Sequence, residues 1–345
     1  MKIDMKKYFT LLFIMFVMFS GCSREKKDQD YPGSFEVLFT DPYGDEDILQ
    51  RAIELISSAE KTIDVESYGF DINEIADSLI AAHNRGISVR IVCERDNYES
   101  DTHSGDPYWD MQNAGIPIVP DNDNSSLTHD KVMIIDSAIV WTGSTNFTFN
   151  GYYLNNNNVL IIESEDVAKT YLEDFSQMFA GDFHTQKTSD GAEKYPVADG
   201  SVEIWFSPED SPDEMLIQNI QNAEQSIYFC IFAFTLADLS SAMINAADRG
   251  ISVHGIFDES SASDSSVTQY YTLLSAGIDV ELDPCPYAFH HKFIVIDPDG
   301  DDPKVITGSG NFSYSGTHQN DENFVVVHSR SIAQKYLDEF ERWKR

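Results

Sequence analysis

The sequence repeats itself over most of its length, and this repeat limits the folds that the chain can adopt. The pentapeptide RGISV occurs at 85–89 and again at 249–253, each time after apolar residues at helical spacing. The sequence YLEDF at 171–175 returns as YLDEF at 336–340. Two matching halves indicate two similar units that pack against each other about a pseudo-twofold axis.

Each half alternates between strand-like and helix-like segments. The first half opens with FEVLF at 35–39 and the second with VEIWF at 202–206, and an amphipathic helical pattern follows in both. An apolar strand pattern comes next, and then a second helical pattern that ends at RGISV. This alternation predicts an α/β fold with a mixed or mostly parallel sheet in each half. We expect a first domain over 34–180, a polar linker over 181–200 and a second domain over 201–345.

The most specific part of the repeat is a polar motif, His-x-Lys-x-x-x-x-Asp, followed by Gly-Ser-x-Asn. The first copy consists of His129, Lys131, Asp136, Ser144 and Asn146, and the second of His290, Lys292, Asp297, Ser309 and Asn311. Residues i and i+2 of a strand point to the same side, so each histidine should face the same way as its lysine. The small residues let the backbone approach a ligand, and asparagine offers an amide donor. An imidazole, a cation and an amide directed at one point suit a phosphoryl group.

A single His-x-Lys triplet would arise by chance, but two copies of the full spacing would not. The duplicated motif resembles the signature of the phospholipase D superfamily, and the resemblance covers nearly all of the chain after residue 22. It implies two similar α/β halves about a pseudo-twofold axis, each giving one motif to a shared active site. It also implies cleavage of a phosphodiester through a covalent phosphohistidine, which water or another alcohol then resolves.

The motif residues suggest how the chemistry is divided. Two imidazoles fit the roles of nucleophile and acid because they titrate near neutral pH. The two motif lysines supply the charge that neutralises the phosphoryl oxygens, so we expect no metal ion or other cofactor. Asp136 and Asp297 end apolar strand patterns, where aspartate commonly begins a turn. The resemblance gives them a supporting role, and we count them among the candidate catalytic residues.

The two halves differ at one position that bears on these roles. Alignment of GSGNFSYSGTHQNDEN with GSTNFTFNGYYLNNNN puts Asn157 opposite Glu322. The resemblance implies that an acidic residue here orients a catalytic imidazole and can reach across the axis to the other half. We therefore expect Glu322 to serve His129 as the nucleophile, and Asn157 to lie near His290 as the general acid. Asparagine can accept a hydrogen bond but cannot stabilise an imidazolium by charge.

The charge of the chain helps to select the substrate. Lys and Arg total 23 against 58 Asp and Glu, a net charge of −35, which disfavours a nucleic-acid surface and strongly anionic lipid, although acidity can also serve solubility alone. We expect phospholipase D-type hydrolysis of a phospholipid, with a metal-independent endonuclease acting on DNA or RNA as the alternative. A cardiolipin-synthase-like phosphatidyltransferase and a non-catalytic binding protein fit less well. One chain holds both motifs, so no oligomer is required.

The first residues have the pattern of an export signal. Lys2, Lys6 and Lys7 precede an apolar run over 8–19, which is short for a membrane span, and Ser-Gly-Cys22 follows. This pattern resembles a bacterial lipoprotein signal with Cys22 as the lipidated residue, and an ordinary cleaved signal is the alternative. We expect a signal peptide over 1–22, a tether over 23–33, and a protein that is exported and lipid-anchored to the bacterial cell envelope.

Three further groups of residues are open to more than one interpretation. Cys93, Cys230 and Cys285 allow at most one disulfide. The aromatic residues that follow the paired strands line the cleft or belong to the core: Tyr68, Phe70, Phe232 and Phe234. The histidines outside the motif are interpreted as structural or surface groups: His83, His103, His184, His254, His318 and His328.

Overall fold

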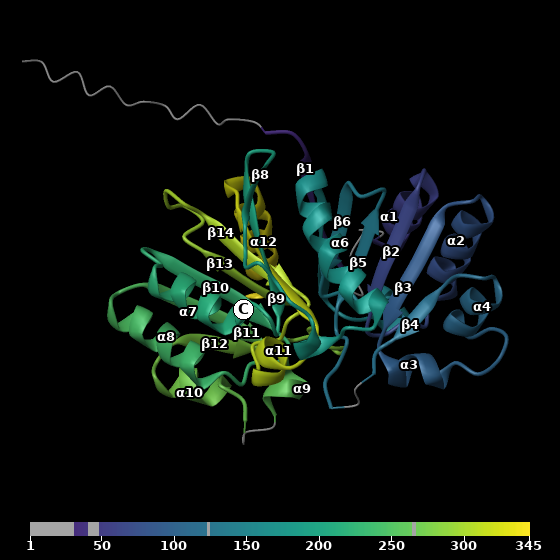
Figure 1. Ribbon diagram of the computed structural model, residues 1–345. Coiled ribbons are helices and arrows are strands. Elements are labelled where there is room, and N and C mark those ends of the chain that lie inside the picture. Colours follow the sequence, from purple (N-terminus) through teal and green to yellow (C-terminus); the bar gives the residue numbers. More distant parts are fainter. Residues whose placement is uncertain (1–30, 41–47, 123–124, 264–266) are drawn as a thin grey trace, which may run out of the picture.

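The computed structural model describes residues 31–40, 48–122, 125–263 and 267–345. The signal peptide expected over 1–22, with Cys22, lies outside these residues, as does most of the expected tether. The described chain forms two α/β halves that lie side by side (Figure 1).

The elements of the two halves follow the same order. The first half consists of β1 (Ser34–Thr40), α1 (Ile48–Ser58), β2 (Thr62–Ser67), α2 (Asn73–Asn84), β3 (Ser88–Cys93), α3 (Arg95–Ser100), α4 (Pro107–Asn113), β4 (Ile118–Pro120), β5 (Lys131–Ile135), β6 (Ile139–Gly143), α5 (Phe149–Tyr153), β7 (Asn157–Glu163) and α6 (Glu165–Ala180). The linker contains η1 (His184–Gln186) and β8 (Lys194–Val197). The second half consists of β9 (Gly200–Ser207), α7 (Pro212–Gln221), β10 (Ser226–Ile231), α8 (Ala237–Asp248), β11 (Ser252–Phe257), α9 (Glu259–Ala262), α10 (Tyr270–Ser275), β12 (Asp279–Leu282), β13 (Lys292–Ile296), β14 (Lys304–Gly308), α11 (Tyr314–His318), β15 (Glu322–His328) and α12 (Arg330–Trp343).

Each half contains one mixed sheet. The strand orders are β1-β7-β6-β5-β2-β3-β4 and β12-β11-β10-β13-β14-β15-β9-β8, which correspond strand for strand apart from β8. Strands β2, β3 and β4 are parallel, whereas the pairings from β2 through β5, β6 and β7 to β1 are antiparallel. The extra strand β8 comes from the linker and pairs with the edge strand β9. The linker is therefore part of the fold.

Alternation along the central strands explains how the layers pack. In β5, Val132 and Ile134 belong to a core shared by the two halves, while Met133 and Ile135 belong to a core within the first half. Successive strand residues point to opposite faces, so a strand that is apolar throughout must be covered on both sides. Helices α6 and α12 lie between the two sheets, while α1, α2 and α4 and, in the second half, α7, α8 and α10 cover the outer faces (Figure 1).

The repeated RGISV sequence ends an outer helix in each half. Gly86 and Gly250 follow α2 and α8 with φ values of +95° and +91°, a left-handed conformation that glycine adopts without a Cβ clash. The preceding Arg85 donates to the carbonyl oxygens of Ile56 and Ser57 at the end of α1. Arg249 likewise caps the end of α7 in the second half. The repeat thus joins two outer helices in each half.

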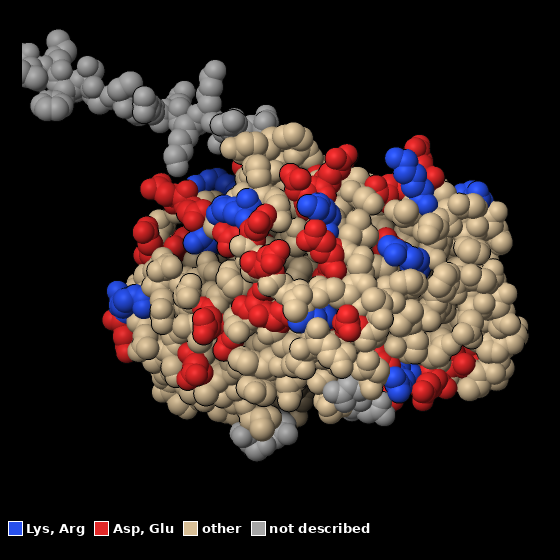
Figure 2. All heavy atoms as spheres, in the orientation of Figure 1, with Lys and Arg blue, Asp and Glu red and all other residues tan. Residues whose placement is uncertain are grey.

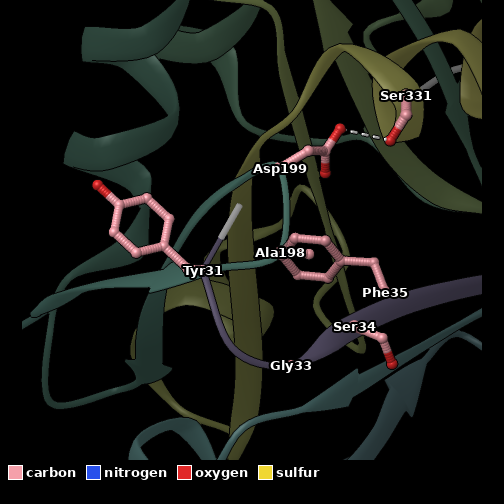
Figure 3. A pocket seen from close by; sticks show the side chains of 7 residues that line it. All are labelled: Tyr31, Gly33, Ser34, Phe35, Ala198, Asp199 and Ser331. Atoms are coloured by element: carbon pink, nitrogen blue, oxygen red, sulfur yellow. Dashed lines mark hydrogen bonds between the residues drawn. The ribbon is translucent and has the colours of Figure 1, made fainter. Parts of the chain in front are cut away.

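A cavity of about 360 Å³ lies where the N-terminal segment meets the linker (Figure 3). It is lined by Tyr31, Gly33, Ser34, Phe35, Ala198, Asp199 and Ser331. The Ser331 hydroxyl donates to Asp199 at 2.8 Å. Ser34 pairs with Glu163 at the end of β7, so this cavity lies at the end of the sheet away from Asn157.

Two further findings concern the cysteines and the helices of the described residues. Cys93 and Cys230 are free thiols, so Cys93, Cys230 and Cys285 form no disulfide with one another. None of the helices in the described ranges has the length and apolar character needed to cross a membrane.

Candidate active site

The two polar motifs meet in one buried site, and each imidazole is held by the opposite half. His129 Nδ1 lies 2.8 Å from Glu322 Oε2. His290 Nδ1 lies 2.9 Å from Asn157 Oδ1 and 3.0 Å from the carbonyl oxygen of Ser144. The residues His129 and His290 are only 7% and 8% exposed. The expected pairing across the pseudo-twofold axis is therefore present.

The ends of four strands bring these groups together. Each motif histidine lies just before a central strand, and β5 and β13 begin at Lys131 and Lys292. Strands β7 and β15 begin at Asn157 and Glu322, so their first side chains reach the histidine of the other half. The backbone also crosses between the halves, because the N–H group of His129 donates to the carbonyl oxygen of Asp321 at 2.9 Å.

Each of the two motif lysines contacts the histidine of its own motif. The Nζ atoms of both lysines donate to the carbonyl oxygen of the histidine two residues earlier. Lys292 Nζ also lies 3.1 Å from His290 Nε2, so histidine and lysine share one side of the chain. Burial and the charges of Lys131 and Lys292 hold the pKa of His129 well below its usual value, and the pKa of His290 is lowered in the same way. Both imidazoles are therefore neutral near pH 7 in the unliganded site.

Burial also shifts the pKa values of Lys131 and Glu322. It lowers the pKa of Lys131 to about 8, against the opposing charges of Glu322 and Asp130. It raises the pKa of Glu322 to about 8, although the charge of Lys131 acts in the other direction. The pKa of Lys292 is lowered well below its usual value by burial and by the charge of Lys131. An anionic ligand between the lysines would offset their mutual repulsion.

One aromatic ring lies against each imidazole. The ring centroids of Tyr68 and His129 are 4.7 Å apart, and those of Phe232 and His290 are 4.8 Å apart. The lysines lie over the same two rings, at 5.3 Å for Lys131 and 5.2 Å for Lys292. By contrast, Phe70 and Phe234 are core residues. Only two of the four aromatic candidates thus belong to the site.

The serines and asparagines of Gly-Ser-x-Asn do different things. The Ser144 hydroxyl donates to Asn157 Oδ1 at 3.0 Å, and the Ser309 hydroxyl donates to Asp130 Oδ1 at 3.2 Å. Ser144 therefore supports the residue that holds His290, whereas Ser309 binds the carboxylate of Asp130 next to His129. Within the described part of the chain, the Oδ1 atoms of Asn146 and Asn311 are buried without a hydrogen-bond partner. Buried polar atoms are normally paired, so these two amides are the better candidates for contact with a ligand.

Asp136 and Asp297 lie away from the imidazoles. Asp136 follows the last residue of β5, roughly 17 Å along the strand from Lys131 at about 3.4 Å per residue. Its carboxylate accepts the backbone N–H groups of Glu60, Lys61 and Thr62 at 2.6 to 3.0 Å. Asp297 does the same in the second half for residues 224–226. Their place among the catalytic residues is therefore revised, because both anchor the turn before a neighbouring strand.

Sequence reasoning missed the polar residues behind the site. Asp130 accepts a hydrogen bond from Asn323 Nδ2 at 2.6 Å, and both side chains are fully buried. His184 and Lys187 of the linker are also buried, although the segment that contains them is polar. Asp130 lies between the histidine and the lysine of the first motif and Asp321 lies next to Glu322, so their positions in the sequence could have marked them, whereas the linker offers no such signal. Within the described ranges, no group of three or more His, Cys, Asp or Glu side chains could hold a metal ion.

Comparison with known proteins assigns the family. Residues 52–179 and 216–344 each match the family described as "Cardiolipin synthase, PLD-like domain". The chain belongs to the phospholipase D superfamily. The prediction of an α/β fold with two similar phospholipase D-like halves is thereby confirmed.

Relatives of this superfamily match shorter stretches. The chain is 35% identical over 137 residues to a phospholipase D of Rickettsia prowazekii, which is 40% of this chain and 64% of that protein. It is 34% identical over 133 residues to a mitochondrial cardiolipin hydrolase of Xenopus tropicalis, 39% of this chain and 61% of that protein. The chain thus spans less than two thirds of the length of these relatives. The phosphatidylserine synthase of Haemophilus influenzae Rd KW20 has a similar fold, with a TM-score of 0.65, 13% identity, and 88% of this chain and 85% of that chain covered.

Proposed function

We propose that this protein is a phosphodiesterase of the phospholipase D type, which hydrolyses a phospholipid head-group phosphodiester through a covalent phosphohistidine at His129. The observation that carries the proposal is the unequal pair of imidazoles in one buried site. His129 has a carboxylate, Glu322, at Nδ1, whereas His290 has the neutral amide of Asn157 there. The names of the relatives, phospholipase D and cardiolipin hydrolase, support the same class of enzyme.

In the first step, Nε2 of His129 attacks phosphorus and the bond to the leaving alcohol breaks. Glu322 accepts a hydrogen bond from the Nδ1–H group of His129, which leaves the lone pair on Nε2 and stabilises the positive charge that develops on the ring. Lys131 and Lys292 neutralise the phosphoryl oxygens. The bound phosphodiester offsets the two lysine charges, so His290 takes up a proton and passes it from Nε2 to the leaving oxygen.

In the second step, water replaces the alcohol. His290, now neutral, removes a proton from the water as its oxygen attacks the phosphohistidine. The bond between phosphorus and His129 Nε2 breaks, and the neutral imidazole regains its lone pair on Nε2 while its Nδ1–H group stays hydrogen-bonded to Glu322. The products are the alcohol and a phosphomonoester, and both imidazoles return to their starting state.

The charge of the molecule favours a lipid over a polynucleotide. The net charge is −35, and on the face in Figure 2 the basic side chains are scattered among acidic ones without forming a continuous track. A polynucleotide needs a series of cations along its backbone. The proposal therefore takes a phospholipid with a zwitterionic or neutral head group as the substrate.

Purified protein should release head group from phosphatidylcholine vesicles in the presence of a chelator, and His129→Asn should not. Single- and double-stranded DNA serve as the competing substrates under the same conditions. Rapid quench with a phosphate-labelled substrate, followed by peptide mapping, should place the label on His129. Cleavage of DNA without cleavage of lipid would show that the substrate is a nucleic acid and not a phospholipid. Label on His290 would reverse the two roles.

We further propose that the protein is exported and anchored through a lipid on Cys22, which would keep the enzyme beside its substrate. The basic start, the apolar run and the Ser-Gly-Cys sequence support this. Cys22→Ser should release the protein from membranes into the soluble fraction. A variant that stays as firmly membrane-bound as the wild type would refute the anchor.

A further inference from the structure

The linker contains a buried cation that joins three separate parts of the chain. Lys187 is 4% exposed, and its Nζ atom lies 2.9 Å from Asp174 of α6. The same atom lies 3.1 Å from Glu209, between β9 and α7, and 3.1 Å from Asp321, just before β15. A buried charge without partners costs several kcal/mol, so this lysine fixes the relative positions of its three partners.

The neighbouring His184 holds the same aspartate. Its backbone N–H donates to Asp321 Oδ1 at 2.9 Å, and its Nδ1 atom lies 2.9 Å from Asp321 Oδ2. His184 has a φ of +53°, a conformation that non-glycine residues adopt only when their surroundings impose it. Thr128 donates to Asp321 Oδ2 from the first half at 3.2 Å. Both oxygens of Asp321 are therefore engaged, and mostly by the linker.

Asp321 connects the linker residues His184 and Lys187 to the imidazole of His129. Its carbonyl oxygen accepts the N–H group of His129, and its own N–H group donates to Leu127 at 2.9 Å. The next residue, Glu322, holds His129 Nδ1 at 2.8 Å. A shift of Asp321 would therefore move both the backbone and the side-chain partner of the imidazole.

We infer that linker residues 184–187 position the pair of Glu322 and His129 for reaction, with Lys187 as the principal positioning residue. The inference rests on the proposed function of His129 as nucleophile. It gives the linker a second role besides joining the two halves. Because these linker contacts act on the side of His129 only, they should affect formation of the phosphohistidine more than binding of the substrate.

The position that corresponds to Asp321 in the other half lacks these linker contacts. Asn156 aligns with Asp321, and both polar atoms of its side chain are buried without a hydrogen-bond partner in the described structure. Glu339 aligns with Asp174, and it lies 3.2 Å from His291. The difference matches the unequal partners of the two imidazoles, since only the imidazole with a carboxylate partner has the residue before that partner held by the linker.

The test replaces Lys187 with Met, which keeps most of the apolar stem and removes the charge. Lys194→Met is the matched control, because Lys194 lies in the same linker but pairs with Glu203 at the surface. Lys187→Met should slow phosphohistidine formation about tenfold to a hundredfold, with KM within about threefold of the wild type, as expected when a catalytic group is displaced by a fraction of an ångström to about 1 Å. Lys194→Met should leave both quantities unchanged.

A spectroscopic measurement separates positioning from general stability. In protein with isotope-labelled histidine, the proton on His129 Nδ1 is assigned through its loss in His129→Asn, and it reports the hydrogen bond to Glu322. This signal should shift or broaden in Lys187→Met and stay in place in Lys194→Met, with both variants folded by circular dichroism. An unchanged signal and an unchanged rate in folded Lys187→Met would overturn the inference.

Two outcomes need separate treatment. If Lys187→Met does not fold, the double variant Lys187→Met with Asp174→Asn removes one cation together with one anion, and the same two measurements apply to it. If the wild type cleaves none of the substrates, the proposed function fails, while the Nδ1 signal still decides whether the linker positions the imidazole. The two failures are therefore distinguishable.

Discussion

Glu322 and Asn157 occupy equivalent positions in the two halves, yet they place different groups beside the two imidazoles. Each is the first residue of its strand, and each reaches Nδ1 of the histidine in the other half at 2.8 to 2.9 Å. A carboxylate stabilises a cationic ring, whereas an amide oxygen only orients it. In the proposed mechanism, this difference makes His129 the better nucleophile and leaves His290 free to give up its proton.

Glu322→Gln should lower the rate of phosphohistidine formation roughly ten- to ten-thousandfold, the range seen when a catalytic imidazole loses its orienting acid. His290→Asn serves as the comparison. With a substrate whose leaving group needs no proton, this variant should still form the adduct, whereas His129→Asn should not. Rapid-quench measurement of the adduct gives both rates. If Glu322→Gln forms the adduct as fast as the wild type, the carboxylate does not serve the nucleophile.

The dependence of kcat/KM on pH should be bell-shaped with a narrow maximum near pH 8. The pKa of Glu322 is raised to about 8 by burial, so activity should rise with pH as the carboxylate ionises. The pKa of Lys131 is lowered to about 8 by burial, so activity should fall as pH rises further and the cation is lost. Glu322→Gln should lack the rising limb. A profile that is flat from pH 6 to 10 would contradict this assignment.

At the scale of elements, β5 and β13 each carry functional and architectural polar groups at opposite ends. The end at Lys131 and Lys292 faces the imidazoles. The other end leads to Asp136 and Asp297, which have φ values of +53° and +48° and bind the turn before β2 or β10. Anchoring β5 to β2 at this end fixes the register of the strand that delivers the histidine.

Asp136→Asn should lower the free energy of unfolding by about 1–3 kcal/mol at pH 7, the value of a hydrogen bond to a charged group. Burial raises the pKa of Asp136, but the three backbone N–H groups lower it by more, so the pKa is lowered overall. A lowered pKa in the folded state stabilises the protein above the pKa of the unfolded state, and this contribution is lost as pH falls through the folded value. The difference in the free energy of unfolding between Asp136→Asn and the wild type should therefore become smaller at acidic pH.

Urea unfolding at several pH values measures this difference, with Asp297→Asn as the counterpart in the second half. The rate constant kcat of folded Asp136→Asn should stay within about tenfold of the wild type, because the carboxylate does not reach the imidazoles. A loss of activity without a loss of stability would return Asp136 to the catalytic residues.

At the scale of the whole molecule, neither half contains a complete site. Each imidazole belongs to one half and its Nδ1 partner to the other. The cores of the halves also merge, since Val132 and Ile134 of β5 pack in the same cluster as Phe293 and Val295 of β13. The active site therefore depends on the packing of the two sheets with α6 and α12 between them.

Residues 34–185 and residues 198–345, produced separately, should each be inactive as monomers. Each piece supplies one imidazole, while the proposed reaction requires a nucleophile and an acid. Activity measured on the monomeric fraction from size-exclusion chromatography tests this. Turnover by either monomeric piece at a rate comparable to the intact protein would refute the shared site.

The sequence by itself determined the α/β repeat, the motif and the difference between Asn157 and Glu322, while the family resemblance supplied the pairing of these two residues with the imidazoles. Periodicity and duplication are local or pairwise signals, and they survive without coordinates because residues at fixed spacing face the same side of a strand or helix. This is why His129 and Lys131, and the difference between Asn157 and Glu322, could be recognised in advance. The same local reasoning could not separate Tyr68 from Phe70, since both follow one strand and only the packing decides which ring meets the imidazole.

Only the tertiary structure decided which polar residues act at a distance. Asp136 matches the motif but lies at the far end of β5, because strand length converts sequence spacing into distance. Lys187 matches no motif, yet its cation lies among carboxylates from three elements far apart in the chain. The energy of a buried charge depends on partners that folding brings together, and no window of the sequence contains all of them.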